Sequence, residues 1–298
     1  MANTLAYSTL FQTNLDKAMV QTAQTSWMEE NAGQVIYNGG KEVKIPKMSL
    51  TGLRNYDRNS GHKKGKVTLE YETKAMTYDR GIDFYLDSMD VNETNFVATA
   101  GTVMGEFQRT KVVPEVDAIR IGALAQVAIT ANNVKASYTP AKSTIVDAIK
   151  DGITVLRDKG FVGEIVIHCT YEVKNQLEKA MAGQLSAVTF SAGGVDTEVP
   201  SLDGCPILPL TSDKMYSSFT ISDEEDGGFA KAEDAKTLNF LLVAREVPIA
   251  VSKTDKIRVF DPRVNQEGDG YSFDYRKYHD IWVLDNKVNG VFACYKEA

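Results

Sequence analysis

The chain has 298 residues, enough for one large core or two moderate ones, and its 43% hydrophobic content is typical of a folded protein. Its net charge of −7 argues against a protein that coats nucleic acid electrostatically. No apolar run approaches the ~20 residues of a membrane span, and the first residues lack the basic and apolar parts of a secretion signal. We therefore expect a chain that folds in the cytoplasm. Cys169, Cys205 and Cys294 form no CxxC motif, which favours buried thiols over a disulfide framework or a zinc site.

Residues 2–36 are rich in Thr, Asn, Gln and Ala, with apolar residues such as Leu10, Leu15 and Trp27 scattered among them. This segment is too polar to form a core of its own and too apolar to remain fully solvated. We expect an arm, or short amphipathic helices, that dock elsewhere.

Apolar and polar residues alternate over much of residues 39–87, a period typical of β-strands. Pro46 places the first strand at a sheet edge, and residues 51–65 read as a polar turn region. The alternating apolar residues are Val43, Ile45, Val67, Leu69, Tyr71, Ile82, Phe84 and Leu86. The pattern predicts one long two-stranded hairpin.

The predicted hairpin is strongly basic towards its tip. Residues 41–66 hold eight basic residues and two acids, Glu42 and Asp57, a net charge of +6. The basic residues are Lys41, Lys44, Lys47, Arg54, Arg58, Lys63, Lys64 and Lys66. An isolated hairpin is marginal in water, so either the rest of the chain or another copy must cover its apolar face. Because no helix inside the segment can do so, we predict an oligomer in which these eight residues contact a neighbouring subunit. A solvated loop is the alternative, and we interpret the four acids at 223–226 that way.

Residues 90–128 carry apolar residues at helical spacing and predict one long helix. Asp90 and Glu93 are placed as a capping box at its start. Pro114 cannot donate to the carbonyl of Thr110, so we expect a kink there or two abutting helices. At about 1.5 Å per residue the whole would be a rod of roughly 50–60 Å. Two ordinary core helices are the alternative.

Strand and helix patterns alternate after the long helix, which predicts an α/β or α+β lobe. The expected elements are a helix from Thr139-Pro140 to Gly160, a strand at Glu164–His168, a helix capped by Thr170, a loop with weak strand over 186–203, and strands at 205–208 and 237–244. From Pro248 the chain becomes extended and aromatic, and Asn289-Gly290 predicts a hairpin between strands 281–284 and 291–295. We expect these last strands to pack against the long helix.

Motifs for chemistry are absent from the sequence. It contains no glycine-rich nucleotide loop, no His-Glu-x-x-His and no Gly-x-Ser-x-Gly. His168 and Cys169 could suggest a catalytic dyad, but neighbours in a strand point to opposite faces. His279-Asp280 is better explained by a structural hydrogen bond, and the acids at 223–226 lack the spacing of a calcium loop. We predict no catalytic residue, no cofactor and no metal site, and a protein that is not an enzyme.

The order of these parts resembles a tailed-phage major capsid protein of the Johnson fold. The resemblance extends to sequence blocks similar to those of capsid proteins from phages and prophages of Gram-positive bacteria. The blocks are 43–53, 55–58, 89–96, 104–109 and 113–117. The resemblance implies an α+β fold with an N-terminal arm at 1–36, an extended loop hairpin at 37–88 and a spine helix of the peripheral domain at 89–131. An α/β axial domain at 132–250 and strands returning to the peripheral domain at 251–298 complete it.

The resemblance also implies a function. Hexamers and pentamers of the chain would assemble in the host bacterial cytoplasm into the icosahedral head of a virion, which encloses double-stranded DNA that the shell contacts non-specifically. A portal is implied, and so is a separate scaffolding protein or a processed chain, since the arm begins at Met1 without a long coiled extension. No motif supports a covalent lysine cross-link at Lys63 or Lys64, and no membrane is involved. The alternatives are a cargo-enclosing nanocompartment of the same fold, or a cytosolic α+β enzyme or ligand-binding module.

Overall fold

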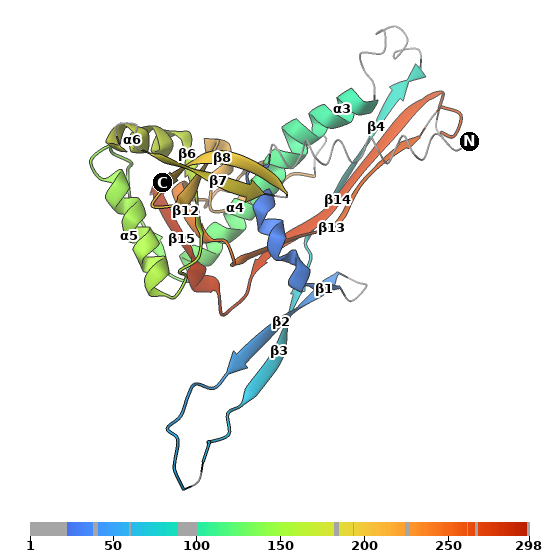
Figure 1. The fold of residues 1–298 in the computed structure, drawn as a ribbon. Helices are drawn as coiled ribbons and strands as arrows, with labels where there is room; N and C mark the ends of the chain where they lie inside the picture. Colours follow the sequence, from blue (N-terminus) through green and yellow to red (C-terminus); the bar gives the residue numbers. More distant parts are fainter. Residues whose placement is uncertain are drawn as a thin grey trace.

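The computed structural model describes residues 23–37, 41–59, 61–88, 100–181, 185–192, 194–223, 227–260, 262–265 and 268–296. Within them one long helix connects two lobes, and a β-hairpin projects away from both (Figure 1). The capping box predicted at Asp90 and Glu93 lies outside the described residues, as do residues 1–22 of the predicted arm.

One lobe, which we call the axial lobe, is built on a mixed seven-stranded sheet in the order β5-β15-β12-β6-β9-β8-β7. Its strands are β5 (Val134–Lys135), β6 (Ile165–Thr170), β7 (Ser186–Ala192), β8 (Val195–Leu202), β9 (Cys205–Leu210), β12 (Thr237–Ala244) and β15 (Val291–Lys296). Helices α5 (Ile145–Asp158) and α6 (Tyr171–Met181) pack on one face, against Ile165 and Ile167 of β6. Val166 points to the opposite face, which the long helix covers. Burial on both faces explains why β6 and β12 are continuous apolar runs.

The other lobe, the peripheral lobe, is a three-stranded antiparallel sheet in the order β13-β14-β4. Its strands are β13 (Pro248–Phe260), β14 (Gly270–Val283) and β4 (Tyr78–Asp87). Met104 and Val116 of the long helix pack on Phe273 and Tyr275 of β14. The prediction that the C-terminal strands pack against the long helix is therefore confirmed.

The long helix consists of α3 (Ala100–Phe107), a π-helical turn η2 (Gln108–Val112) and α4 (Val113–Thr130). The break expected at Pro114 takes the form of this wider turn. Pro114 lacks the N–H that the carbonyl of Thr110 would accept, and the N–H of Val113 donates to the carbonyl of Gln108, five residues back. The π-turn thus lets the helix continue through the proline as one rod.

Three expectations for local structure are corrected. Ile82, Phe84 and Leu86 do not prolong the hairpin, because β4 pairs with β14, and Phe84 and Leu86 pack beneath the long helix. Residues 186–202 form the paired strands β7 and β8 rather than a loop with weak strand. Asn289-Gly290 lies in a short 3-10 turn, η4 (Val288–Gly290), after which β15 pairs with β12 and not with β14.

The described end of the arm docks on the rest of the chain, as expected, and packs with both lobes. It forms a 3-10 helix η1 (Ser26–Gln34) and a short strand β1 (Ile36–Tyr37). Trp27 and Met28 are fully buried in the core below α4. The hydroxyl of Thr25 donates to Asp117 over 2.6 Å, and Glu29 pairs with the buried guanidinium of Arg120. Both partners lie on α4, so the segment is fixed to the long helix.

Candidate assembly surface

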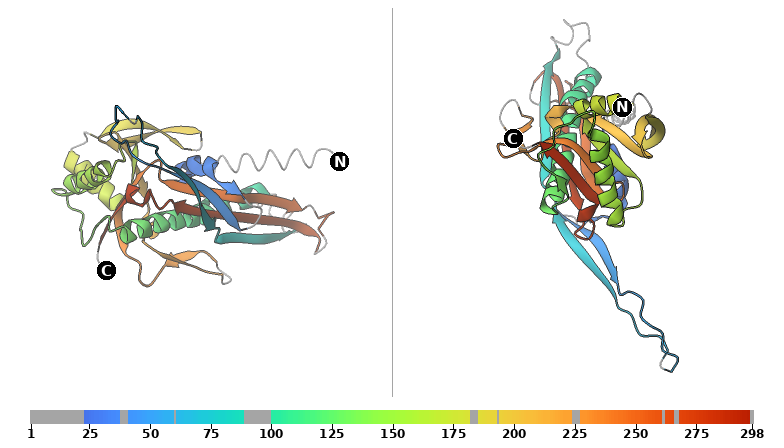
Figure 2. Two further views of the ribbon diagram at one scale, coloured as in Figure 1. Left: turned by 90° about the horizontal axis from the view of Figure 1, so that it is seen from below. Right: turned by 90° about the vertical axis from the view of Figure 1, so that its left-hand side faces the viewer.

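The projecting hairpin consists of β2 (Glu42–Leu50) and β3 (Val67–Ala75), which pair antiparallel along their whole length. It leaves the body of the molecule as an arm with no other element beside its outer half (Figures 1 and 2). Residues 51–66 close its tip, where the N–H of Thr51 donates to the carbonyl of Lys66 over 3.1 Å.

The root of the hairpin belongs to the core of the peripheral lobe. Val43 and Ile45 are fully buried and pack with Met76, Ile249 and Tyr278. Two long-range contacts to Asp285 add to this packing. Lys74 lies 3.7 Å from the Asp285 carboxylate, and the backbone N–H of Asp285 donates to Glu72 over 3.3 Å. The direction of the hairpin is therefore set by buried side chains of β13 and β14.

The outer half of the hairpin presents an apolar face to solvent. Met48 pairs with Leu69, and Leu50 pairs with Val67. Residues directly opposite each other in an antiparallel pair share a face, so these four side chains lie on the same side of the hairpin. The exposed fractions are Met48 62%, Leu50 67%, Val67 66%, Leu69 54% and Tyr71 52%. We call these five residues the apolar face. Monomeric soluble proteins rarely expose neighbouring large apolar side chains in this number, which makes the face a candidate contact surface.

Basic residues gather at the tip beyond this face. Arg54, Arg58, Lys63, Lys64 and Lys66 are exposed, and within the described residues none of them forms an ion pair. With Asp57 as the one acid, residues 51–66 carry a net charge of +4 (five basic residues minus one acid). The structure thus brings five of the eight predicted contact residues into one loop.

The other three basic residues lie near the root. Lys41 is exposed, and Lys44 and Lys47 are half-buried. Lys47 lies 3.3 Å from Glu72 of the paired strand, so its charge is already matched inside the chain. Lys47 is accordingly a poor candidate for a contact with a neighbour. The alternation in the sequence could not show this, because it does not give the register of β2 against β3.

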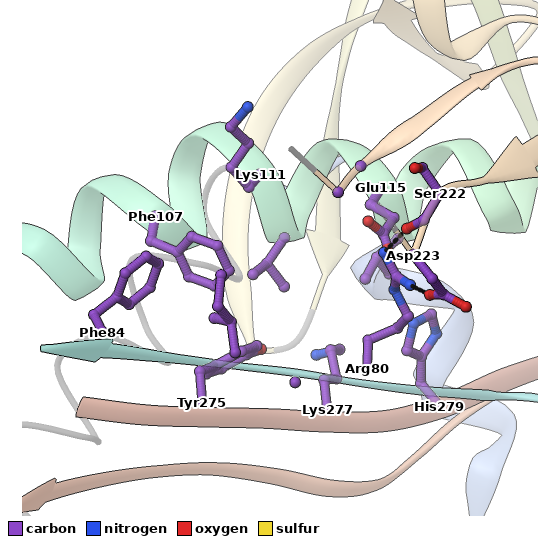
Figure 3. A pocket seen from close by; sticks show the side chains of 16 residues that line it. Arg80, Phe84, Phe107, Lys111, Glu115, Ser222, Asp223, Tyr275, Lys277 and His279 are labelled. Atoms are coloured by element: carbon purple, nitrogen blue, oxygen red, sulfur yellow. Dashed lines mark hydrogen bonds and ion pairs between the residues drawn. The ribbon is translucent and has the colours of Figure 1, made fainter. Parts of the chain in front are cut away.

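A cavity of about 540 Å³ lies beneath the π-turn, between the long helix, the peripheral sheet and the hairpin of β10 (Phe219–Ile221) and β11 (Phe229–Lys231) (Figure 3). One end is apolar, formed by Phe84 and Phe107, and the other holds Arg80, whose Nε lies 3.0 Å from Glu115. Sequence reasoning missed this cavity, since its walls come from segments far apart in the chain.

Two buried histidines and the buried Cys169 have pKa values unsuited to acid–base chemistry. Burial lowers the pKa of His279, on the cavity wall, to about 3, whereas a general base works best with a pKa near 7. Burial also lowers the pKa of His168 to about 3 and raises the pKa of the Cys169 thiol to about 12. A Cys/His dyad needs a thiolate, which this environment disfavours.

The described part of the chain shows neither a metal-binding cluster nor a membrane-spanning helix. No group of three or more His, Cys, Asp or Glu residues there is placed to hold a metal ion. Among the same residues, no helix combines the length and the apolar character that crossing a membrane requires.

Sequence comparison finds no matching protein-family model and no matching curated protein. Solved structures do match. The capsid structure of cyanophage P-SCSP1u is similar over 87% of this chain and 84% of that chain, with a TM-score of 0.60 and 10% identity. The mature capsid of bacteriophage PhiM1 is similar over 87% and 83%, with a TM-score of 0.56 and 11% identity. A structure from Mycobacterium phage Che8 is similar over 89% and 88%, with a TM-score of 0.56 and 15% identity.

The chain has the tailed-phage capsid fold. The predicted fold class, α+β of the Johnson type, is confirmed by these matches, which extend over most of each chain. At 10–15% identity they establish the fold. Within this capsid fold the apolar face and the basic tip are carried on the element that stands farthest from the body of the subunit (Figure 2).

Proposed function

We propose that the chain is a major capsid protein, many copies of which close as hexamers and pentamers into an icosahedral shell around double-stranded phage DNA. The observation that carries this proposal is the projecting hairpin, whose apolar face no described part of its own chain covers. The fold, shared with solved phage capsid structures, supports it.

The parts of the subunit follow from this proposal. We assign residues 1–36 to an arm, 37–88 to the extended loop, 89–131 to the spine helix, 132–250 to the axial domain and 251–298 to the return strands. Because β4 lies in the peripheral sheet, the projecting part of the extended loop is limited to residues 41–76. The protein would be located in the virion after assembly in the host bacterial cytoplasm, with a separate scaffolding protein and a portal as partners.

The proposed mechanism starts from the apolar face. Burying one such side chain completely contributes about 1.5–3 kcal/mol, so burying the exposed half of each contributes about 1 kcal/mol. Five side chains then give on the order of 5 kcal/mol per hairpin before the cost of ordering is subtracted. Such a contact is modest alone. Each subunit of a shell makes one and receives one, and closure of the shell adds them together.

The basic tip has a different role in this mechanism. Its unpaired charges act over about 8 Å at physiological ionic strength, which guides two subunits towards each other before the apolar faces meet. Exposed ion pairs contribute little to final stability, so we assign the tip to encounter and register and the apolar face to affinity.

The test is the size of the purified protein. Size-exclusion chromatography and negative-stain microscopy should show capsomers or particles tens of nanometres wide. A compact monomer or dimer would overturn the proposal and favour an enzyme or ligand-binding module. Particles produced in cells that enclose protein cargo instead of DNA would indicate a nanocompartment.

A further inference from the structure

Charge is distributed unevenly across the three strands of the peripheral sheet. β13 carries Lys253, Asp255, Lys256 and Arg258, a net charge of +2 (three basic residues minus one acid). β4 carries Asp79, Arg80, Asp83 and Asp87, a net charge of −2 (one basic residue minus three acids). The central strand β14 balances Asp274 and Asp280 against Arg276 and Lys277. The sheet therefore has a basic strand at one edge and an acidic strand at the other.

These charges lie mainly on the face turned away from the long helix. Ile257 on β13 and Ile82 on β4 both pair with Tyr275, which packs under the helix. Side chains alternate along a strand, so the even-numbered residues of this part of β13 and the odd-numbered residues of β4 point away from the helix. We define the basic edge as Lys256 and Arg258, and the acidic edge as Asp79, Asp83 and Asp87.

Ion pairs inside the sheet satisfy only part of this charge. Arg258 lies 2.7 Å from Asp274, and Arg276 lies 2.6 Å from Asp79. Lys256 and Asp83 have no such partner among the described residues, although Asp83 accepts a hydrogen bond from Ser272 over 2.8 Å. One cation on the basic edge and one anion on the acidic edge thus remain for contacts outside the sheet.

Charged edge strands often protect a sheet from unwanted pairing. If both edges had the same sign, any edge of one copy would repel any edge of a second copy. Because the two edges have opposite signs, repulsion arises only when the same edge of two copies meets. When the basic edge of one copy meets the acidic edge of another, the same charges attract.

We propose that the basic edge of one subunit lies beside the acidic edge of the next, in a head-to-tail contact between copies of this chain. Pairing related by a two-fold axis brings like edges together and is disfavoured by repulsion. Head-to-tail contacts generate closed rings, which two-fold contacts do not. The strands that meet run in the same direction, since β13 and β4 are both antiparallel to β14.

The hairpin is joined to the same strand. Its root packs on Ile249 and Val251, at the start of β13, and the basic edge lies further along that strand. The inference rests on the proposed shell function and adds to it the second half of the contact, the acidic edge that receives a neighbour.

A charge swap tests the contact. Lys256→Glu and Asp83→Lys each place a like-charged pair across it, and each should raise the threshold concentration for assembly at least about fivefold, because the penalty recurs at every contact. Inside the chain the new side chains lie opposite Arg276 and Asp274, so folding should be preserved. The chain carrying both substitutions should assemble at the wild-type threshold again, since opposite charges meet once more. Lys179→Glu on α6, an exposed lysine of the axial lobe, is the matched control.

Mixing the two single variants gives a sharper result. Every contact is complementary when the variants alternate, and alternation closes only in rings with an even number of subunits. An equimolar mixture should therefore form rings or open sheets where neither variant does alone, while closed particles that need odd-numbered rings stay absent. Threshold concentrations by light scattering and ring sizes by negative-stain microscopy provide the measurements.

Cross-linking tests the contact without changing the sign of a charge. Chains with Lys256→Cys, mixed with chains with Asp83→Cys, should form a disulfide-linked dimer on mild oxidation, because the proposed contact brings the two new thiols together. The three native thiols are buried and should not compete. A double variant that assembles no better than the poorer single variant, together with the absence of this dimer, would overturn the proposed contact. Wild-type protein that never assembles would instead overturn the shell function.

Discussion

Replacing the centre of the apolar face should separate assembly from folding. Met48 and Leu69 lie directly opposite each other on β2 and β3 and are 62% and 54% exposed. The double substitution Met48→Thr with Leu69→Thr keeps residues that suit a strand and removes most of the apolar area at this pair. In the isolated subunit both positions face solvent, so the free energy of unfolding should change by less than about 0.5 kcal/mol.

The effect on assembly follows from the exposed fractions. Complete burial of each side chain contributes about 1.5–3 kcal/mol, and somewhat more than half of each is available for burial by a neighbour. The pair thus contributes about 2–3 kcal/mol per hairpin contact. Since about 1.4 kcal/mol corresponds to a tenfold change in an equilibrium constant, the threshold concentration should rise roughly thirty- to hundredfold.

Light scattering over a dilution series measures the threshold, and thermal unfolding followed by circular dichroism measures the fold. Ile45→Ala on the same strand provides the contrast, because Ile45 is fully buried at the root and its truncation should cost about 2–5 kcal/mol of unfolding free energy. If the double threonine variant assembles at the wild-type concentration while remaining folded, the apolar face is not buried in the shell, and the reasoning from exposure fails.

Three further predictions concern the tip, the solvent and the buried histidine. Deleting residues 51–66 should leave a folded, soluble subunit that forms no shells by size-exclusion chromatography, and normal particles would refute the role of the tip. Raising salt from 0.15 to 1 M shortens the screening length from about 8 to 3 Å and should slow early assembly in stopped-flow light scattering; a rate indifferent to salt would exclude steering. Burial lowers the pKa of His168 from 6.5 to about 3, so below pH 6.5 the unfolded chain binds more protons than the folded one. Stability should therefore be intact above pH 6.5 and fall as the pH drops towards 3, by about 2 kcal/mol at pH 5, and His168→Phe should flatten this slope in denaturant titrations. An unchanged slope would mean that His168 is protonated in the folded chain.

Local sequence was sufficient for the central strands β6 and β12 of the axial lobe and for helix α6, although not for β7 and β8. The apolar runs in β6 and β12 are buried on both faces, which is the reason such runs predict central strands. Thr170 accepts a hydrogen bond from the N–H of Val173 over 3.3 Å, as its position before an apolar helix pattern indicated. In these places, propensity, pattern and tertiary burial agree.

Sequence was insufficient where a strand had to choose its partner. The period of two in Ile82, Phe84 and Leu86 identifies a strand, and it is silent on pairing. β4 turns away from the hairpin because Phe84 packs edge-on against Phe107 of the long helix, a residue outside any local window. Asn289-Gly290 failed as a hairpin signal for a similar reason, since β15 pairs with β12, where its side chains are buried on both faces of the axial sheet.

The candidate surface divides in the same way. Counting charges located the basic stretch, and five of its eight residues lie at the exposed tip. The pairing of Lys47 with Glu72 and the opposite signs of the two sheet edges required the register. Within one strand, the sequence shows which side chains share a face, because they are two residues apart. Which side chains of different strands lie next to each other depends on the register, which the sequence does not show.

The long helix explains why a contact at one lobe concerns the whole subunit. Its α3 and π-turn pack on the peripheral sheet through Met104 and Val112, while the far end of α4 packs in the core of the axial lobe through Leu124 and Ala128. One continuous rod thus contributes to both cores, and the described end of the arm is fixed to it through Asp117 and Arg120. A neighbour that binds the hairpin or a sheet edge therefore sets the position of the axial lobe as well. In the proposed shell, contacts at the hairpin and at the sheet edges therefore act on one packed unit, and their modest strengths add together.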